Sequence, residues 1–194
     1  MKTKIAGILL AAGESKRFGS DKLLYRLKCG DQIGIKAAKK LKQFVDDTKI
    51  VLPKENKSRE KKFRSLHFDI LKNTKDQAEL SLSLKTGLSA IQNFDYCIIA
   101  LADMPFISKD TYSHMINLLC SKSFDLVAPS FKNRRGHPVG ISSTVIEHFL
   151  EVNQKVLIKE YFKKAQFSKC IFPTDDPGII CDIDYPKDLN STLH

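Results

Sequence analysis

The sequence lacks the features of a membrane protein and of a disulfide-bonded scaffold. No apolar run approaches the roughly 18 residues that a membrane-spanning helix needs. The five cysteines are odd in number, and no two of them show CxxC spacing. These absences argue against a membrane span, a disulfide framework and a zinc site, and they predict a protein of a reducing cytoplasm.

A signal peptide and a division into domains find little support. The apolar stretch of residues 5–12 is short for a signal peptide, and Glu14, Lys16 and Arg17 follow it at once. The 194 residues contain no repeat, low-complexity tract or linker. We therefore expect one domain that spans residues 1–194.

Acidic residues are scarcer than basic residues in this sequence. Lys and Arg number 32 against 22 Asp and Glu, which gives a formal net charge of +10. This excess suits an anionic partner such as a nucleotide, a nucleic acid or a phosphorylated small molecule, although scattered lysines also form an ordinary solvated surface. The densest basic run, residues 54–64, has few apolar members and is interpreted as the outer face of a helix.

Short apolar runs alternate with segments of helical periodicity. Strands are predicted at residues 5–10, 49–52, 68–71, 96–101, 126–128, 139–141, 167–172 and 179–183. Helices are predicted at residues 33–44, 80–91, 112–119, 144–151 and 156–163. The alternation predicts an α/β fold, in which a Rossmann-like, mostly parallel sheet carries helices on both faces.

Ligands of an open α/β sheet collect beyond the carboxyl ends of its strands. Three polar stretches lie at such places: residues 11–22, residues 102–105 and residues 182–188. Their shared position predicts a common site more strongly than any one of them does.

The first stretch, in LLAAGESKRFGSDK, breaks both familiar phosphate-loop spacings. Five residues separate Gly13 from Gly19, so neither the P-loop pattern nor GxGxxG is met. The glycines nevertheless permit close approach of the backbone, and Arg17 and Lys22 supply charge-assisted hydrogen bonds to an anion. A phosphate-binding loop and a long surface turn both remain open on composition alone.

The second and third stretches carry carboxylates. Asp103, at the end of an apolar strand in LADMPF, is costly to bury unless it is hydrogen-bonded, paired or bound to metal. It is interpreted as a Mg²⁺ ligand rather than a helix cap, because Ser108 is itself a good N-cap. Asp182 and Asp184 point to one side if their segment is extended, which also favours a cation. Alternatively, Asp184 simply precedes a helix that Pro186 begins.

A fourth stretch, NRRGHPVG, forms a cationic loop. We expect Arg134, Arg135, Gly136 and His137 to bind an anionic acceptor. His137 has no neighbouring Cys or Ser arrangement that would make it the base of a nucleophile, so proton chemistry is not predicted here.

Together the four stretches resemble the molybdenum cofactor cytidylyltransferase family, within the nucleotidyltransferases of nucleotide-diphospho-sugar transferase type. LLAAGESKRFGSDKLL is similar to that family's LxAGxSxRxGxxK signature, ALADMP to its LADMP, and RRGHPVG to its GHPV motif. DIDYPKDL is similar to the closing DxDTPxDL, with Tyr185 where Thr is usual. The resemblance covers nearly the whole chain in the family's order.

The resemblance implies that an acceptor phosphate attacks the α-phosphorus of a nucleoside triphosphate and that pyrophosphate leaves. The acceptor implied is molybdopterin, a phosphorylated pterin, with a molybdoenzyme apoprotein as a further partner. No catalytic triad is needed, because such transfer asks mainly for positioning and charge neutralisation. The start Ala11-Ala12-Gly13 is more similar to the cytidylyl than to the guanylyl branch, which favours CTP.

The family's site residues transfer to matching positions in this sequence. Arg17, Lys22 and Asp103 are implied as catalytic, and the implied nucleotide-binding residues are Leu10, Ala11, Ala12, Gly13, Arg17, Lys22, Asn73 and Ser83. Asp103 and Asp184 are implied to hold Mg²⁺ with support from Asp182, and Arg134 to His137 are implied to face the acceptor.

One departure leaves alternatives open. Glu79 and Leu80 stand where the family often has Gly-Met, beside the base and ribose, so the base is not determined. The rival hypotheses are a nucleotidyltransferase that uses GTP or another phosphorylated acceptor, and a nucleotide- or cofactor-binding chaperone without turnover. Nucleic acid is not an expected partner, because the sequence shows no aromatic stacking platform or reader module.

Overall fold

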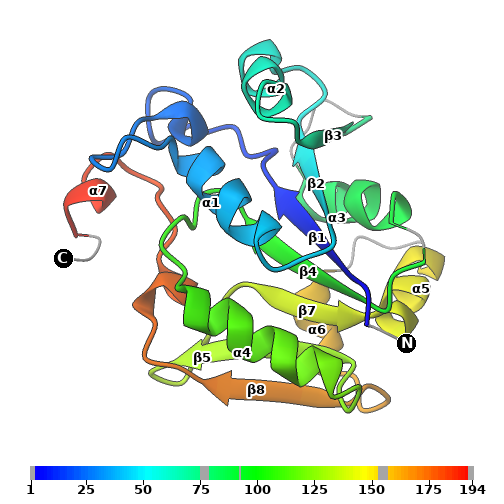
Figure 1. Cartoon of the computed structure of the whole chain (residues 1–194). Coiled ribbons are helices and arrows are strands. Elements are labelled where there is room, and N and C mark those ends of the chain that lie inside the picture. The colour runs from blue at the N-terminus through cyan, green and yellow to red at the C-terminus, as the bar shows by residue number, and fades with distance from the viewer. Residues whose placement is uncertain (1–2, 75–78, 92, 153–156, 192–194) are drawn as a thin grey trace.

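A computed structural model describes residues 3–74, 79–91, 93–152 and 157–191, and in this part of the chain one sheet of eight strands forms the centre (Figure 1). The strands are β1 Ile5–Leu10, β2 Asp47–Leu52, β3 Asp69–Lys72, β4 Tyr96–Leu101, β5 Leu126–Phe131, β6 Arg134–Arg135, β7 Val139–Ser142 and β8 Lys169–Pro173. The helices are α1 Ile33–Lys42, α2 Lys57–Arg64, α3 Leu80–Ser89, α4 Lys109–Cys120, α5 Ser143–Glu151, α6 Ile158–Tyr161 and α7 Asp188–Ser191, with 3₁₀ turns η1 Lys22–Leu24 and η2 Pro177–Ile180.

The sheet has the order β3-β2-β1-β4-β7-β5-β6, and β8 pairs with β5. Pairs β3–β2, β2–β1, β1–β4 and β5–β8 are parallel, whereas β7 runs antiparallel between β4 and β5. The predicted α/β fold with a mostly parallel sheet is therefore confirmed. In the parallel half, Leu10 at the end of β1 lies beside Leu101 at the end of β4, so the loops that follow both strands leave the same edge.

Two apolar layers explain why β1 is buried along its whole length. On one face, Leu9 packs in a cluster with Leu41 of α1 and Met115 of α4. On the other, Ile8 packs in a cluster with Leu84 of α3 and Ile146 of α5. The predicted placement of helices on both faces is thus confirmed, and Figure 1 shows α1 and α4 on one side of the sheet and α3 and α5 on the other.

Side-chain hydrogen bonds at the N-cap mark where α4 begins. The hydroxyl of Ser108 accepts a hydrogen bond from the Thr111 amide at 3.1 Å, as expected of the N-cap of α4.

Helix α3 approaches β1 so closely that a Cβ at Gly87 would lie 2.8 Å from Cγ2 of Ile8. A glycine is therefore required where this helix crosses the sheet.

The predicted strand at residues 179–183 is wrong. Pro177 opens the turn η2 instead, because its fixed φ and missing N–H suit a first helical position. The Asp176 carboxylate caps this turn through the Gly178 amide and also accepts a hydrogen bond from the Ser108 amide at 2.7 Å. Ile179 is nonetheless fully buried, so the apolar pattern reported burial and not a strand.

Several helix boundaries also differ from the predicted ones. The helix expected at residues 156–163 is α6, Ile158–Tyr161, and Val156 lies outside the described residues. The helix expected at Pro186 begins at Asp188.

In the described part of the chain, no helix has the length and apolarity needed to cross a membrane.

Asp125 joins three elements at the sheet edge opposite the carboxyl end of β1. Its carboxylate accepts hydrogen bonds from the Ser142 hydroxyl at 2.8 Å and from the amide and hydroxyl of Ser168 at 2.9 and 2.8 Å. Burial by itself would raise the pKa of Asp125, but these donors outweigh it and lower the pKa.

We predict that Asp125→Asn lowers the free energy of unfolding by about 1–2 kcal/mol at neutral pH, because the substitution removes the charge and replaces one of two acceptor oxygens by an NH2 group that faces hydrogen-bond donors. A carboxylate with a lowered pKa stabilises the fold above its unfolded pKa, and this contribution disappears as pH falls through the folded pKa. Urea denaturation of both proteins should therefore show a difference at pH 7 that shrinks below about pH 4. A difference that is independent of pH would contradict this account.

Candidate active site

A single backbone hydrogen bond brings two distant acidic segments together. The Ile183 amide donates to the carbonyl oxygen of Asp103 at 3.0 Å, and the Ile183 side chain is completely buried. Asp103 follows β4 by two residues, so the chain at residues 181–184 is held against the carboxyl end of that strand. Asp184 therefore lies beside Asp103, as the sequence predicted for these two residues.

Lys22 joins the two carboxylates. Its ammonium lies 2.9 Å from Oδ2 of Asp103 and 2.9 Å from Oδ1 of Asp184, and its side chain is only 8% exposed. The guanidinium of Arg17 contacts the other oxygen of Asp184 at 3.0 Å. Three segments that lie up to 167 residues apart thus meet in one ion cluster of Arg17, Lys22, Asp103 and Asp184.

The charges of this cluster support one another. Burial by itself would lower the pKa of Lys22, but Asp103 and Asp184 outweigh it and raise the pKa, so the ammonium stays charged. The hydrogen bond from Lys22, with a further contribution from Arg17, lowers the pKa of Asp184. The carboxylate and the ammonium are therefore both ionised at neutral pH.

A cleft of about 450 Å³ opens over the ion cluster. It is lined by Gly13, Glu14, Ser15, Lys16, Arg17, Lys22, Asp103 and Asp184. A Cβ at Gly13 would meet no atom within 4 Å, whereas Gly19 has a φ of +78°, a conformation that favours glycine. The opening stretch is thus a loop that faces a cleft with a mixed lining of cations and carboxylates, and not a turn remote from other functional groups.

Ala11 and Ala12 connect this loop to the sheet. Both side chains are buried, and the Ala11 amide donates to the Val51 carbonyl at 2.9 Å.

The interpretation of residues 54–64 as an outer helix face is wrong at Arg59, which is 2% exposed and donates to the backbone of the opening loop. The spacing between Arg59 and the buried Phe63, four residues, was a signal for a shared inward face.

Asn73 and Ser83 are also brought together. Asn73 follows β3, and its Nδ2 donates to the Ser83 hydroxyl of α3 at 3.0 Å. Both side chains are almost fully buried, and Oδ1 of Asn73 has no hydrogen-bond partner among the described residues. The Ser83 hydroxyl donates in turn to the Glu79 carbonyl at 3.3 Å. An unpaired buried amide oxygen favours a donor from a bound molecule.

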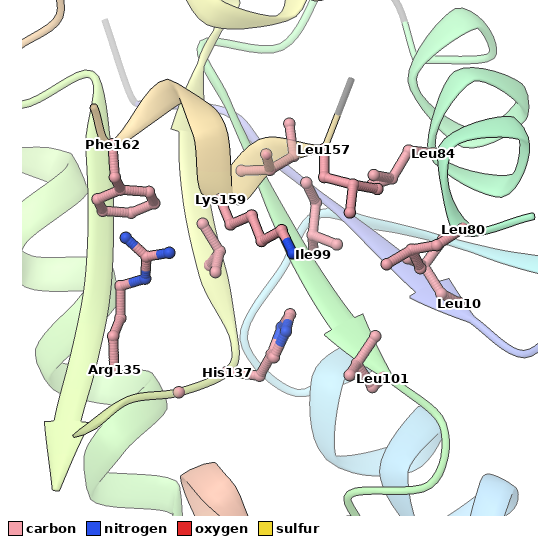
Figure 2. A pocket seen from close by; sticks show the side chains of 13 residues that line it. Leu10, Leu80, Leu84, Ile99, Leu101, Arg135, His137, Leu157, Lys159 and Phe162 are labelled. Atoms are coloured by element: carbon pink, nitrogen blue, oxygen red, sulfur yellow. The ribbon is translucent and has the colours of Figure 1, made fainter. Parts of the chain in front are cut away.

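A second cavity, of about 250 Å³, lies between the ends of β1 and β4 and helices α3 and α6 (Figure 2). Its lining is mainly apolar and consists of Leu10, Leu80, Leu84, Ile99, Leu101, Arg135, Gly136, His137, Val139, Leu157, Ile158, Lys159 and Phe162. Leu101 in this lining lies two residues before Asp103 in the chain, and the charge of Asp103 acts on the pKa of His137, so the apolar cavity lies near the ion cluster.

Three basic side chains enter this apolar cavity. The guanidinium of Arg135 stacks on the Phe162 ring at 4.0 Å, and Figure 2 shows Lys159 reaching inward from α6. Nδ1 of His137 is buried and has no hydrogen-bond partner among the described residues. Burial lowers the pKa of His137, although the backbone of Ile99 and the charge of Asp103 oppose the shift. The imidazole is therefore neutral at pH 7, and because its other nitrogen donates to the backbone of Ile99, Nδ1 can accept one hydrogen bond.

The backbone around Gly136 holds His137 in this position. The Gly136 amide donates to the Pro129 carbonyl and the His137 amide to the Ile179 carbonyl, both at 2.9 Å. A Cβ at Gly136 would lie 2.1 Å from the Ile179 oxygen, so only glycine fits. Of the four residues predicted to face an acceptor, Arg135, Gly136 and His137 line the cavity, whereas Arg134 is exposed and is not among the lining residues.

Asp182 is a predicted site residue that lines neither the cleft nor the apolar cavity. Its side chain is exposed, and its charge acts on the pKa of His137 and of Cys181. Among the described residues, no group of three or more His, Cys, Asp or Glu side chains has the geometry of a metal site. Two carboxylates that converge on one cation do fit Mg²⁺ held partly by a ligand's phosphates, because this ion commonly takes one or two carboxylates with substrate oxygens.

Comparison with known proteins places this geometry in a family. The family described as "MobA-like NTP transferase domain" matches residues 7–167. A probable molybdenum cofactor guanylyltransferase of Natranaerobius thermophilus is 28% identical over 131 residues, 66% of this chain and 62% of that protein. The 2-C-methyl-D-erythritol 4-phosphate cytidylyltransferase of Dictyoglomus thermophilum is 32% identical over 132 residues, 64% of this chain and 55% of that protein.

The chain thus spans less than two thirds of the length of these two curated relatives. A crystal structure from Mycobacterium sp. strain JC1 has the same fold, with a TM-score of 0.79 at 19% identity over 98% of this chain and 96% of that one.

Proposed function

Because the chain belongs to the family of MobA-like NTP transferase domains, we propose that it transfers a nucleoside monophosphate from a nucleoside triphosphate to a phosphorylated acceptor and releases pyrophosphate. The observation that carries the proposal is the meeting of Lys22, Asp103 and Asp184 beneath the cleft of the opening loop. A reaction of this kind needs anions held in line and their charge neutralised, and the cluster offers both.

In this proposal the cleft binds the triphosphate. Arg17 and Lys22 pair with the β- and γ-phosphates and stabilise the leaving pyrophosphate, and amides between Gly13 and Gly19 add donors to the same oxygens. The basic side chains lie at the end of β1, so the nucleotide extends past Ala11 and Ala12 toward Asn73 and Ser83. The attacking group is the acceptor's own phosphate, which is ionised at neutral pH, so no protein base is required.

Asp103 and Asp184 are proposed to hold Mg²⁺, with Asp182 in support. Bound there, Mg²⁺ would supply charge neutralisation on the phosphates of the transferred group. The ammonium of Lys22 lies where the oxygens of Asp103 and Asp184 converge. Lys22 must therefore leave these oxygens before they can hold a metal ion, and its ammonium is then free to pair with a phosphate.

The apolar cavity is proposed to hold the acceptor, a phosphorylated pterin such as molybdopterin. A flat heteroaromatic ring suits a mainly apolar lining with a few convergent polar groups, here His137, Arg135 and Lys159. A small polyol phosphate, the type of acceptor named for the Dictyoglomus thermophilum relative, would leave several hydroxyls against leucine and isoleucine without partners. The lining therefore favours the pterin.

We predict that Asp103→Ala abolishes Mg²⁺-dependent pyrophosphate release while the protein keeps its fold. The reason is that one of two converging carboxylates is lost, and the expected fall in kcat is at least about a hundredfold. The assay mixes purified protein, CTP, Mg²⁺ and molybdopterin, and circular dichroism checks the fold. Asp110→Ala, which removes an exposed carboxylate from the first turn of α4, is the matched control and should retain activity. A fully active, metal-dependent Asp103→Ala protein would rule out the assignment.

CTP is the proposed substrate, because the start Ala11-Ala12-Gly13 is more similar to the cytidylyl branch. The Natranaerobius thermophilus relative is named a guanylyltransferase, so GTP is the rival, and Glu79 at the start of α3 stands near the proposed nucleoside residues. Thermal unfolding with CTP, GTP, ATP or UTP and Mg²⁺ should show the largest rise in midpoint with CTP, since preferential binding stabilises by mass action. Repeated turnover with the same nucleotide would support an enzyme, and binding without turnover a carrier.

We predict that Lys22→Met binds Mn²⁺, without nucleotide, about tenfold more tightly than the wild type. The ammonium that competes for the carboxylate oxygens is gone, and the two like charges it leaves favour a cation. Calorimetric titration measures the change, with Lys16→Met, on the exposed side of the same loop, as control. The same Lys22 variant should show a higher KM for CTP and a lower kcat. Equal Mn²⁺ affinity of wild type and variant would exclude the proposal that a metal ion replaces the Lys22 ammonium between Asp103 and Asp184.

A further inference from the structure

Arg59 of α2 makes an unusually complete set of contacts with the opening loop. Its Nε donates to both carboxylate oxygens of Asp21 at 2.9 and 2.8 Å. One terminal nitrogen donates to the carbonyls of Ala11 and Gly13 at 2.7 and 2.8 Å, and the other donates to the Ser15 hydroxyl at 3.1 Å. All these acceptors lie 38 to 48 residues before Arg59 in the chain.

These contacts determine which way the peptide groups of the loop face. A trans peptide is planar, so its N–H points opposite to its C=O. Because Arg59 holds the carbonyls of Ala11 and Gly13, the amides of Ala12 and Glu14 point away from the guanidinium. Ser15 has a φ of +57°, which is uncommon for a residue with a side chain, and its hydroxyl accepts from both Arg59 and the Lys22 amide. The loop is thus held in a conformation that its own sequence does not favour.

The same guanidinium reaches Lys22 through Asp21. Oδ1 of Asp21 accepts a hydrogen bond from the Leu23 amide at 3.2 Å and so caps the turn η1, whose first residue is Lys22. Asn56, the N-cap of α2, donates to Oδ2 of Asp21 at 3.1 Å. Helix α2, the loop and the turn that carries Lys22 therefore form one connected network centred on Arg59.

We propose that Arg59 is a positioning residue for the nucleotide: it holds residues 11–22 in the conformation that binds the triphosphate, without touching the substrate itself. This inference rests on the proposed function for its kinetic part only. A guanidinium is suited to the task because it presents five donors in a rigid fork, whereas an ammonium presents three donors from one point. Its charge is compensated by Asp21, so it can remain buried at neutral pH.

A purely structural role would have a different signature. If Arg59 only stabilised the fold, its loss would lower the midpoint of thermal unfolding and the active fraction, and neither KM would change. As a positioning residue it should act on one substrate. The cavity proposed for the acceptor is lined by residues of β1, α3, β4, β6, β7 and α6, and Arg59 makes no hydrogen bond to any of these elements in the described residues.

The experiment compares Arg59→Met and Arg59→Lys with Arg64→Met, an exposed arginine of the same helix that pairs with Glu60. In Arg59→Met we expect KM for CTP to rise about tenfold to a hundredfold and KM for molybdopterin to stay within about twofold. Arg59→Lys should recover part of the loss, and Arg64→Met should match the wild type. Hydrogen–deuterium exchange of the protein without nucleotide should quicken at residues 13–24 and stay unchanged in β4 and α4.

Two outcomes would overturn the proposal. One is an Arg59→Met protein with wild-type exchange at residues 13–24 and wild-type KM for CTP. The other, decisive if Arg59→Met does not fold, is an Arg59→Lys protein that equals the wild type in both measurements. If the wild type itself shows no turnover, the proposed reaction fails separately, and the exchange data with the binding of Mg²⁺–pyrophosphate still decide the role of Arg59.

Discussion

The rest of the site depends on one ion bridge, in which the ammonium of Lys22 lies between the carboxylates of Asp103 and Asp184. A buried ammonium is tolerated only where its charge is compensated, so the bridge needs all three side chains in place at once. Each comes from a different part of the chain: the loop after β1, the loop after β4, and the irregular segment before α7. The fold must therefore bring three chain segments to one edge of the sheet.

The pairing of the sheet, one backbone hydrogen bond and the contacts of Arg59 meet this requirement. Parallel pairing of β1 with β4 places the loops that follow them side by side, and the hydrogen bond from Ile183 to Asp103 adds the third segment. Arg59 contributes further, because its hydrogen bonds to Asp21 and to the Gly13 carbonyl hold the loop that carries Lys22. Removal of buried partners from such a network costs more than its individual hydrogen bonds suggest, since the groups that remain stay buried and unpaired.

Two cavities of different chemistry lie at this edge of the sheet. The cleft above the ion bridge is lined by charged and small residues, and the neighbouring cavity is lined mainly by leucine, isoleucine and an arginine stacked on Phe162. An arrangement of this kind suits a reaction between a highly charged donor and a flatter acceptor whose reactive groups meet between the two cavities. Leu10 and Leu101 both line the apolar cavity because β1 and β4 end there in register.

The sequence alone was enough to predict the α/β class, the mostly parallel sheet and the position of Asp103 beyond a strand end, because apolar periodicity and residue type are local properties. Asp184 lies beside Asp103 as expected, but it follows the turn η2 and not a strand. It also predicted that Asn73 and Ser83, and likewise Arg135 and His137, share sites, through motif resemblance. It failed at residues 179–183, where burial was mistaken for a strand, and at Arg59, where a basic run was interpreted as solvated. Only the tertiary structure decided that Lys22 bridges the carboxylates and that Arg59 points inward, because both depend on partners 38 or more residues away.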